Sequence, residues 1–135
     1  MNSTSNLATF GFISALLASI TIQAQDSLQV ATTQVKTEVV AARMERELSL
    51  SKDQTQRVSI ILQERFESLK QSTTNKTKQL ATANDIATKK LTEVLTAPQF
   101  TEYNQIRSDT KKQKEEFLKK NPGYKFTDQE KEMDF

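Results

Sequence analysis

Residues 25–97 contain neither glycine nor proline, the two residues that most often interrupt regular secondary structure. The stretch is rich in Gln, Lys, Glu, Ala, Leu and Arg, which favour the α-helix, and it also holds many Thr and Ser. We therefore expect an all-α fold. The full chain of 135 residues has the length of one domain of this kind.

Apolar residues recur at steps of three and four, which predicts one apolar face on each of four amphipathic helices. The first helix is predicted over residues 27–47, with a thin stripe of Leu28, Ala31, Val35, Val39 and Ala42. The second is predicted over residues 52–71, with Val58, Ile61, Leu62, Phe66 and Leu69. The third carries Leu80, Ala83, Ala87, Leu91 and Val94, and the fourth carries Phe100, Tyr103, Ile106, Thr110 and Phe117.

The polar run over residues 71–77 separates the second helix from the third. Its Ser, Thr and Asn side chains compete for backbone hydrogen bonds, which favours a turn and an antiparallel hairpin. The alternative is one long helix, because apolar positions on either side of the run keep the same heptad phase. The stripes are narrow and large apolar residues are few, so we expect a hairpin or cradle arrangement in which two chains form a homodimer.

Residues 7–22 form an uncharged, largely apolar stretch, and Ala24 then offers a small residue for signal-peptidase cleavage before Gln25. We predict that residues 1–24 are a secretory signal peptide, so that the mature protein is exported and has no integral membrane segment. The alternative is a permanent anchor helix. A membrane span needs about 20 consecutive apolar residues, and this stretch is shorter and contains Ser and Thr.

One pattern occurs twice, as Leu50-Ser51-Lys52-Asp53-Gln54 and as Leu95-Thr96-Ala97-Pro98-Gln99. In each copy the hydroxyl side chain is placed to accept from the amide three residues on, while the glutamine reaches back to the cap residue's own amide. Such a capping box opens a helix. In the second copy Leu95 is also placed to pack on Phe100, and Pro98 falls in the first turn, where it needs no amide hydrogen.

This doubled motif on an exported helical chain resembles the Spy/CpxP family of periplasmic proteins, which is named for its LTxxQ motif. The second copy matches the motif fully, and the first has Ser51 in place of Thr. The resemblance covers residues 27–120 and implies a periplasmic α-helical protein, often a cradle-shaped dimer. It implies an ATP-independent chaperone or an envelope-stress protein that binds unfolded or misfolded proteins.

Cysteine and histidine are absent, which removes thiolate nucleophiles, imidazole bases and the commonest zinc and haem ligands. Carboxylate pairs one or two residues apart on a helix do not face each other, so we predict no catalytic residues, no metal site and no cofactor. The basic residues of 111–120 are offset by Glu115 and Glu116, and no aromatic platform interleaves with them, which argues against nucleic-acid binding. We expect a protein that is not an enzyme.

The helical domain is predicted to end at residue 120, because Asn121-Pro122-Gly123 stops the last helix. Residues 121–135 form an acidic C-terminal tail, which we expect to be flexible. Its charge opposes that of residues 27–125, which hold 18 Lys and Arg against 12 Asp and Glu. The tail is therefore placed to fold back and compete with clients.

The local positive charge predicts that unfolded clients are captured electrostatically and then held by apolar contacts. The candidate client-binding residues, chosen because they lie on or beside the stripes of the two central helices, are Arg57, Arg65, Phe66 and Lys89. Each is equally compatible with an ordinary core or surface position. The alternative function is a regulatory or structural envelope protein that docks onto one specific partner by helix-in-groove contact.

Overall fold

The computed structural model describes residues 25–71 and 74–134, with side chains described from residue 33 onward. The chain divides into two compact units, Met1–Ala31 and Thr32–Phe135. In the first unit only residues 25–31 are described, and they are helical. The signal peptide predicted for residues 1–24 lies outside the described residues.

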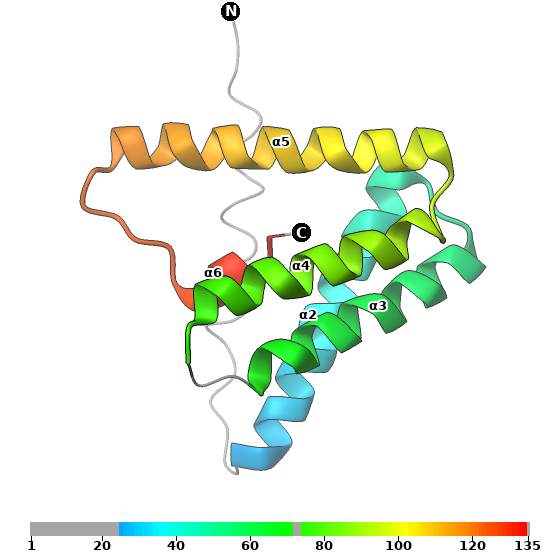
Figure 1. The fold of residues 1–135 in the computed structure, drawn as a ribbon, viewed down its shortest axis with the longest axis horizontal. Helices are drawn as coiled ribbons and strands as arrows, with labels where there is room; N and C mark the ends of the chain where they lie inside the picture. Colours follow the sequence, from blue (N-terminus) through cyan, green and yellow to red (C-terminus); the bar gives the residue numbers. More distant parts are fainter. Residues whose placement is uncertain (1–24, 72–73, 135) are drawn as a thin grey trace, which may run out of the picture. The chain divides into compact units, whose positions relative to one another are not determined.

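The helices are, in chain order, α2 (Gln25–Leu48), α3 (Lys52–Lys70), α4 (Lys76–Thr92), α5 (Ala97–Lys120) and α6 (Asp128–Glu132) (Figure 1). No strand occurs among the described residues, so the predicted all-α class is confirmed. No helix in the described part of the chain is long and apolar enough to cross a membrane.

The turn after α2 places Ser49 in the left-handed backbone region, with a φ of 51°. The Leu50 amide then donates to the Glu45 carbonyl at 3.1 Å, five residues back, which is the hydrogen bond of a Schellman motif. An L-residue in this region is held there by its surroundings. Here the next residue, Leu50, is buried and anchors the turn in the core.

Helix α3 ends at Lys70 and α4 begins at Lys76, so the alternative of one continuous helix across residues 71–77 is wrong. Asn75 caps α4 from the left-handed region, and its side chain accepts from the Lys78 amide at 3.2 Å. The two helices lie side by side in opposite directions, since Gln79 bonds to the Ser68 carbonyl and Gln54 to the Val94 carbonyl.

The core of the second unit lies mainly between α2, α3 and α4. Val58 and Leu62 on α3 and Leu91 on α4 are the largest fully buried side chains. The predicted stripes of α3 and α4 agree with their buried residues, although Leu69, Leu80 and Val94 are half-buried. On α5 only Tyr103 of the predicted stripe is buried, because this helix diverges from α4 beyond its first turns (Figure 1).

The predicted face of the first helix is wrong. Ala42 is exposed, Val35 and Val39 are half-buried, and the side chains of Leu28 and Ala31 lie outside the described ones. The buried face is instead formed by Thr33, Thr37, Val40, Ala41, Met44 and Leu48. The prediction weighed small apolar residues alone, whereas the helix buries its large residues Met44 and Leu48 and accepts two threonines on the same side.

Truncation of the core should be costly where packing is complete. We expect Leu62→Ala to lower the free energy of unfolding by about 2–5 kcal/mol, because the side chain has no exposed area and leaves a cavity. Ile60 lies two residues away on the same helix but is 54% exposed, so Ile60→Ala should change stability by less than about 0.5 kcal/mol. Urea unfolding measures both, and equal losses would contradict this core.

Candidate functional site

The two motif copies lie at the starts of α3 and α5. Ser51 and Thr96 are the N-cap residues, and in each copy the glutamine accepts from the cap residue's amide, at 3.0 Å for Gln54 and 2.9 Å for Gln99. Leu50 and Leu95 are buried, and Phe100 is half-buried against Tyr103, with ring centroids 5.8 Å apart. Both helix starts are therefore fixed by local bonds and by an apolar neighbour.

The two glutamines also bond to each other, a contact that connects residues 45 positions apart. Gln54 Nε2 donates to Gln99 Oε1 at 2.7 Å, and Gln99 Nε2 donates to Gln54 Oε1 at 3.2 Å. Each amide then donates to the turn before the other motif, Gln54 to the Val94 carbonyl and Gln99 to the Leu48 carbonyl. We call this set the glutamine node. Its groups are neutral amides, so it joins two turns and offers no reactive group.

The four candidate client-binding residues do not form one surface. Arg57 on α3 and Lys89 on α4 are exposed, and neither makes an ion pair in the described part of the chain. Arg65 and Phe66 are buried, with only 2% of each exposed. These two do contact each other, because the Arg65 guanidinium carbon lies 5.0 Å from the centroid of the Phe66 ring.

The Arg65 guanidinium binds backbone carbonyl groups of the C-terminal segment. Its Nη1 donates to the Glu132 carbonyl at 2.7 Å and its Nη2 to the Asp134 carbonyl at 3.3 Å, while Nε donates to Asn84 Oδ1 at 2.7 Å. Burial lowers the pKa of Arg65 to about 10, so the group is fully charged at neutral pH. A buried charge needs such partners, because its lost hydration is otherwise uncompensated.

Lysines from three helices bind the carboxylates of the same segment. Lys36 on α2 pairs with Glu132 at 2.6 Å, Lys76 on α4 pairs with Asp128 at 2.9 Å, and Lys114 on α5 pairs with Asp134. The side chain of Met133, between the two acidic residues, is 6% exposed. We call Lys36, Arg65, Lys76, Asn84 and Lys114 the tail groove, since these residues hold the acidic tail that the sequence led us to expect as flexible.

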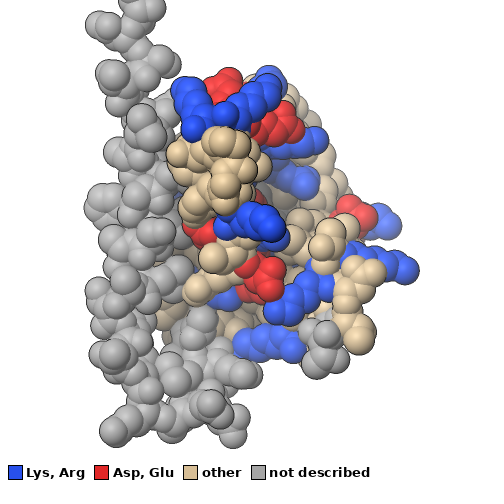
Figure 2. Space-filling view, turned by 90° about the vertical axis from the view of Figure 1, so that its left-hand side faces the viewer, with Lys and Arg blue, Asp and Glu red and all other residues tan. Residues whose placement is uncertain are grey.

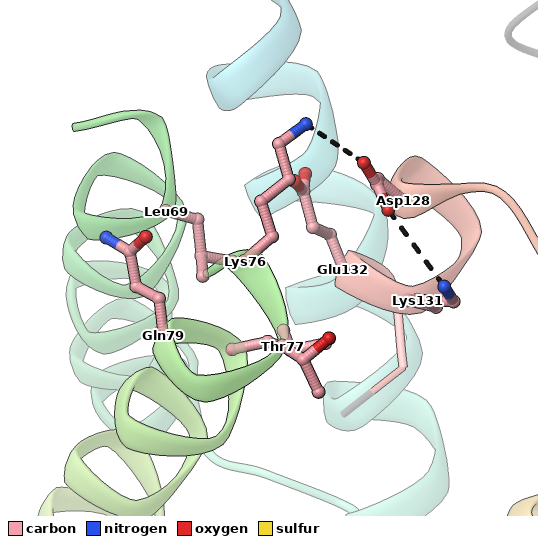
Figure 3. A pocket seen from close by; sticks show the side chains of 8 residues that line it. Leu69, Lys76, Thr77, Gln79, Asp128, Lys131 and Glu132 are labelled. Carbon is pink, nitrogen blue, oxygen red and sulfur yellow. Dashed lines mark hydrogen bonds and ion pairs between the residues drawn. The ribbon is translucent and has the colours of Figure 1, made fainter. Parts of the chain in front are cut away.

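The start of α4 and helix α6 enclose a small pocket of about 140 Å³ (Figure 3). Asp128 lies between Lys76 and Lys131 at its mouth, with dashed lines to both. The hydrogen bond from Lys76 lowers the pKa of Asp128 and raises that of Lys76. The remaining wall comes from Leu69, Thr77, Gln79, Leu80 and Glu132.

The connector between α5 and α6 folds back onto the end of α5 through aromatic contacts. The ring centroids of Phe117 and Tyr124 lie 5.0 Å apart, and those of Tyr124 and Phe126 lie 5.2 Å apart. The Lys114 ammonium lies 4.5 Å from the Phe126 ring centroid, and burial lowers the pKa of Lys114. Helix α6 begins at a third capping box, formed by Thr127 and Glu130.

A wider, open cleft of about 620 Å³ lies between α4, α5 and the tail. We call it the basic cleft, because four cations and two carboxylates line it, together with polar residues of α4 and α5 and two apolar side chains. The charged residues are Arg107, Lys111, Lys114, Lys131, Glu115 and Asp134, and the apolar ones are Leu118 and Phe126. Figure 2 shows Lys and Arg gathered with Asp and Glu at the height of α5, above an uncharged area.

Sequence reasoning missed most of the tail groove. A signal was present, because Arg65 stands within the apolar stripe of α3 and is placed to be buried with a partner. Lys36, Asn84 and Lys114 carry no such signal, since each becomes a neighbour of the tail only through tertiary packing. No group of three or more Asp or Glu side chains in the described residues is arranged to hold a metal ion. The tail groove holds the chain's own acidic segment through backbone carbonyls and through carboxylates.

Compared with known proteins, the chain matches no family model, no curated protein sequence and no solved structure.

The glutamine node should behave as one energetic unit. We expect the losses of unfolding free energy from Gln54→Ala and Gln99→Ala not to add, with a coupling of about 0.5–3 kcal/mol in a double-mutant cycle. The reason is that either substitution already breaks the bonds between the two amides. The control is Gln63→Ala with Gln105→Ala, whose side chains bond only within their own helices. Urea unfolding of all six variants decides, and additive losses at the node would contradict the shared network.

Acid should loosen helix α6. The bond from Lys76 lowers the pKa of Asp128 below 3.8, and the backbone bond from Thr127 lowers the pKa of Glu130 below 4.5. A carboxyl group whose pKa is lowered in the folded state contributes stability at pH values above its ordinary pKa. This contribution is lost as the pH falls through the lowered pKa. We expect the amide resonances of residues 128–134 to move toward unfolded positions below pH 4.5, while that of Leu62 stays. Unmoved tail resonances at pH 2.5 would refute this.

Proposed function

We propose that the protein is an exported, ATP-independent, chaperone-like protein that binds unfolded or misfolded proteins. The observation that carries the proposal is the basic cleft, an open concavity of about 620 Å³ lined by cations and by apolar side chains. The composition supports a binding role, since the chain has no cysteine or histidine for nucleophilic or imidazole chemistry. The doubled motif and residues 1–24 support membership of the Spy/CpxP family and a periplasmic location.

Two steps of client binding follow from the chemistry of this cleft. Arg107 and Lys111 lie on α5 and face a space that Leu118 also borders. Positive charge attracts acidic segments over a distance that salt limits, with a Debye length of roughly 8 Å at physiological ionic strength. Leu118 is 37% exposed and offers a small apolar contact. Contacts of this size hold a client weakly, so the client leaves without any nucleotide-driven step.

The proposal includes a homodimer. Ile60 on α3 and Ile86 on α4 are large apolar side chains that are 54% and 53% exposed. A second copy that covered one of these positions would remove apolar surface from water, which favours association. The helices of the second unit bury few large side chains, and this also fits a fold completed by a partner chain.

The second candidate is a regulatory or structural protein with one specific partner. The tail groove favours this function. Its three lysines pair with the side chains of Asp128, Glu132 and Asp134, and its arginine binds two backbone carbonyls of the same segment. A site that combines so many directed contacts discriminates between segments of different sequence. A chaperone with many clients depends instead on the open cleft.

Aggregation of an acidic client diluted from urea tests the proposed function at low and high salt. We expect the wild type to protect the client at low salt and less at high salt. The variant Lys111→Glu should lose protection at low salt, because the exposed Lys111 side chain lines the basic cleft. The matched variant Lys52→Glu carries the same change in charge at an exposed position outside the cleft and should keep it. Arg107 is left unchanged, because its guanidinium stacks on Tyr103 and bonds to Thr88. Arg65 is left unchanged, since it is buried.

The outcomes distinguish the chaperone-like function from the function with a single partner. Equal loss in both variants would mean that charge acts over the whole surface and that the cleft is not the client site. Protection that is insensitive to salt and to both variants would contradict electrostatic capture. No protection by the wild type would overturn the chaperone proposal and favour the protein with a single partner.

A further inference from the structure

We propose that the tail groove is a recognition site for a short acidic segment of another protein, and that the chain's own residues 127–134 occupy it as a resident, displaceable ligand. The inference rests on the proposed function only in that the chain binds other proteins. The ligand is a segment with acidic residues on both sides of one apolar residue, and the tail regulates its binding by occupying the groove.

The first part of the recognition is independent of side chains. Arg65 donates to the carbonyls of Glu132 and Asp134, at the C-terminal end of α6. The last carbonyls of any helix lack partners within the helix, so any short helix that ended here would present the same acceptors. Asn84 holds the guanidinium in place through its bond to Nε. A buried cation aimed at backbone oxygens is suited to bind a peptide in general.

The second part reads the side chains of the segment. Lys36 and Lys114 each have 14% of their side chains exposed and pair with Glu132 and Asp134 respectively. Between these acidic residues Met133 is buried. A segment with the order acidic, apolar, acidic is therefore recognised by a lysine at each acidic residue and by burial of the apolar side chain. Lys76 adds a more exposed pair with Asp128, one turn earlier in α6. A segment that replaces the tail needs this pattern of three residues.

The tail is attached in a way that permits exchange. Helix α6 has five residues, which is too short to be stable alone. The side chains of Lys76 and Asp128 are 65% and 54% exposed, and water and salt screen such exposed pairs so that they add little stability. One buried side chain, Met133, supplies the apolar anchor. Because departure of the tail takes two acceptors from the buried Arg65, the groove favours replacement of the tail by another acidic segment over remaining empty.

The test uses the full mature chain and a labelled synthetic peptide of residues 124–135. The wild-type groove is filled by a tethered segment whose effective concentration is in the millimolar range, so the free peptide should bind weakly. The variant Met133→Asp should undock the tail and bind the peptide at least about tenfold tighter. The control Gly123→Asp adds the same charge on the connector, where a side chain meets nothing within 4 Å, and should behave as the wild type. A peptide that carries the substitution Met133→Asp should not bind.

A second measurement needs no variant. The mature chain contains Met44 and Met133, so the Met133 methyl resonance of the wild type reports whether the tail is docked. We expect millimolar unlabelled peptide to shift this resonance toward its free position, while a scrambled peptide leaves it in place. The inference is overturned if the resonance stays unchanged and Met133→Asp binds the peptide no tighter than the wild type.

The peptide experiments and the aggregation assay test the tail groove and the chaperone role separately. Peptide binding without protection of unfolded clients would support the groove and remove the chaperone role. Client protection with no peptide binding would keep the chaperone role and remove the groove. Protection by Met133→Asp that exceeds that of Gly123→Asp would support both, with the tail as an inhibitor of client binding.

Discussion

The burial of the Arg65 guanidinium is the constraint on which the arrangement of the second unit depends. A charge at this position is stable only when hydrogen-bond acceptors replace its water, and the chain supplies them from Asn84 and from the carbonyls of Glu132 and Asp134. Residues 67 and 69 positions further along the chain are thereby brought to α3. The C-terminal segment is thus part of the packing around α3 and α4, and its displacement requires other acceptors in its place.

The glutamine node supplies hydrogen-bond partners to backbone groups at the starts of α3 and α5. The turns before α3 and α5 are short, and their backbone groups need partners away from water. Each motif satisfies its own helix start and then donates to the carbonyl of the other turn, Val94 or Leu48. This explains why the motif is useful twice in one chain, since a single copy would cap a helix but would leave the second turn unanchored. The node therefore joins the starts of α3 and α5.

Local rules allowed much of the fold to be predicted from the sequence. The absence of glycine and proline gave the helical class, and the spacing of large apolar residues identified the buried faces of α3 and α4. The face of α2 was predicted wrongly, because small residues and threonines do not reveal which side of a helix meets a neighbour. For the binding surfaces, Arg57 and Lys89 proved to be exposed and Arg65 buried, a difference that periodicity alone does not show. Lys36, Asn84 and Lys114 could not be predicted, because only tertiary packing makes them neighbours of the tail.

The two surfaces share residues, which has a consequence for how binding is regulated. Lys114 and Asp134 pair with each other in the tail groove, and both also line the basic cleft. With the tail docked, Asp134 pairs with Lys114, while Lys131 of the same tail contributes a cation to the cleft. If the tail left, the cleft would lose Lys131 together with Asp134, so the formal charge of its lining would stay the same. The change would instead fall on Lys114, which would lose its carboxylate partner. An acidic segment that replaced the tail would pair with Lys114 again, so a ligand of the tail groove and an acidic ligand of the basic cleft would compete for this lysine.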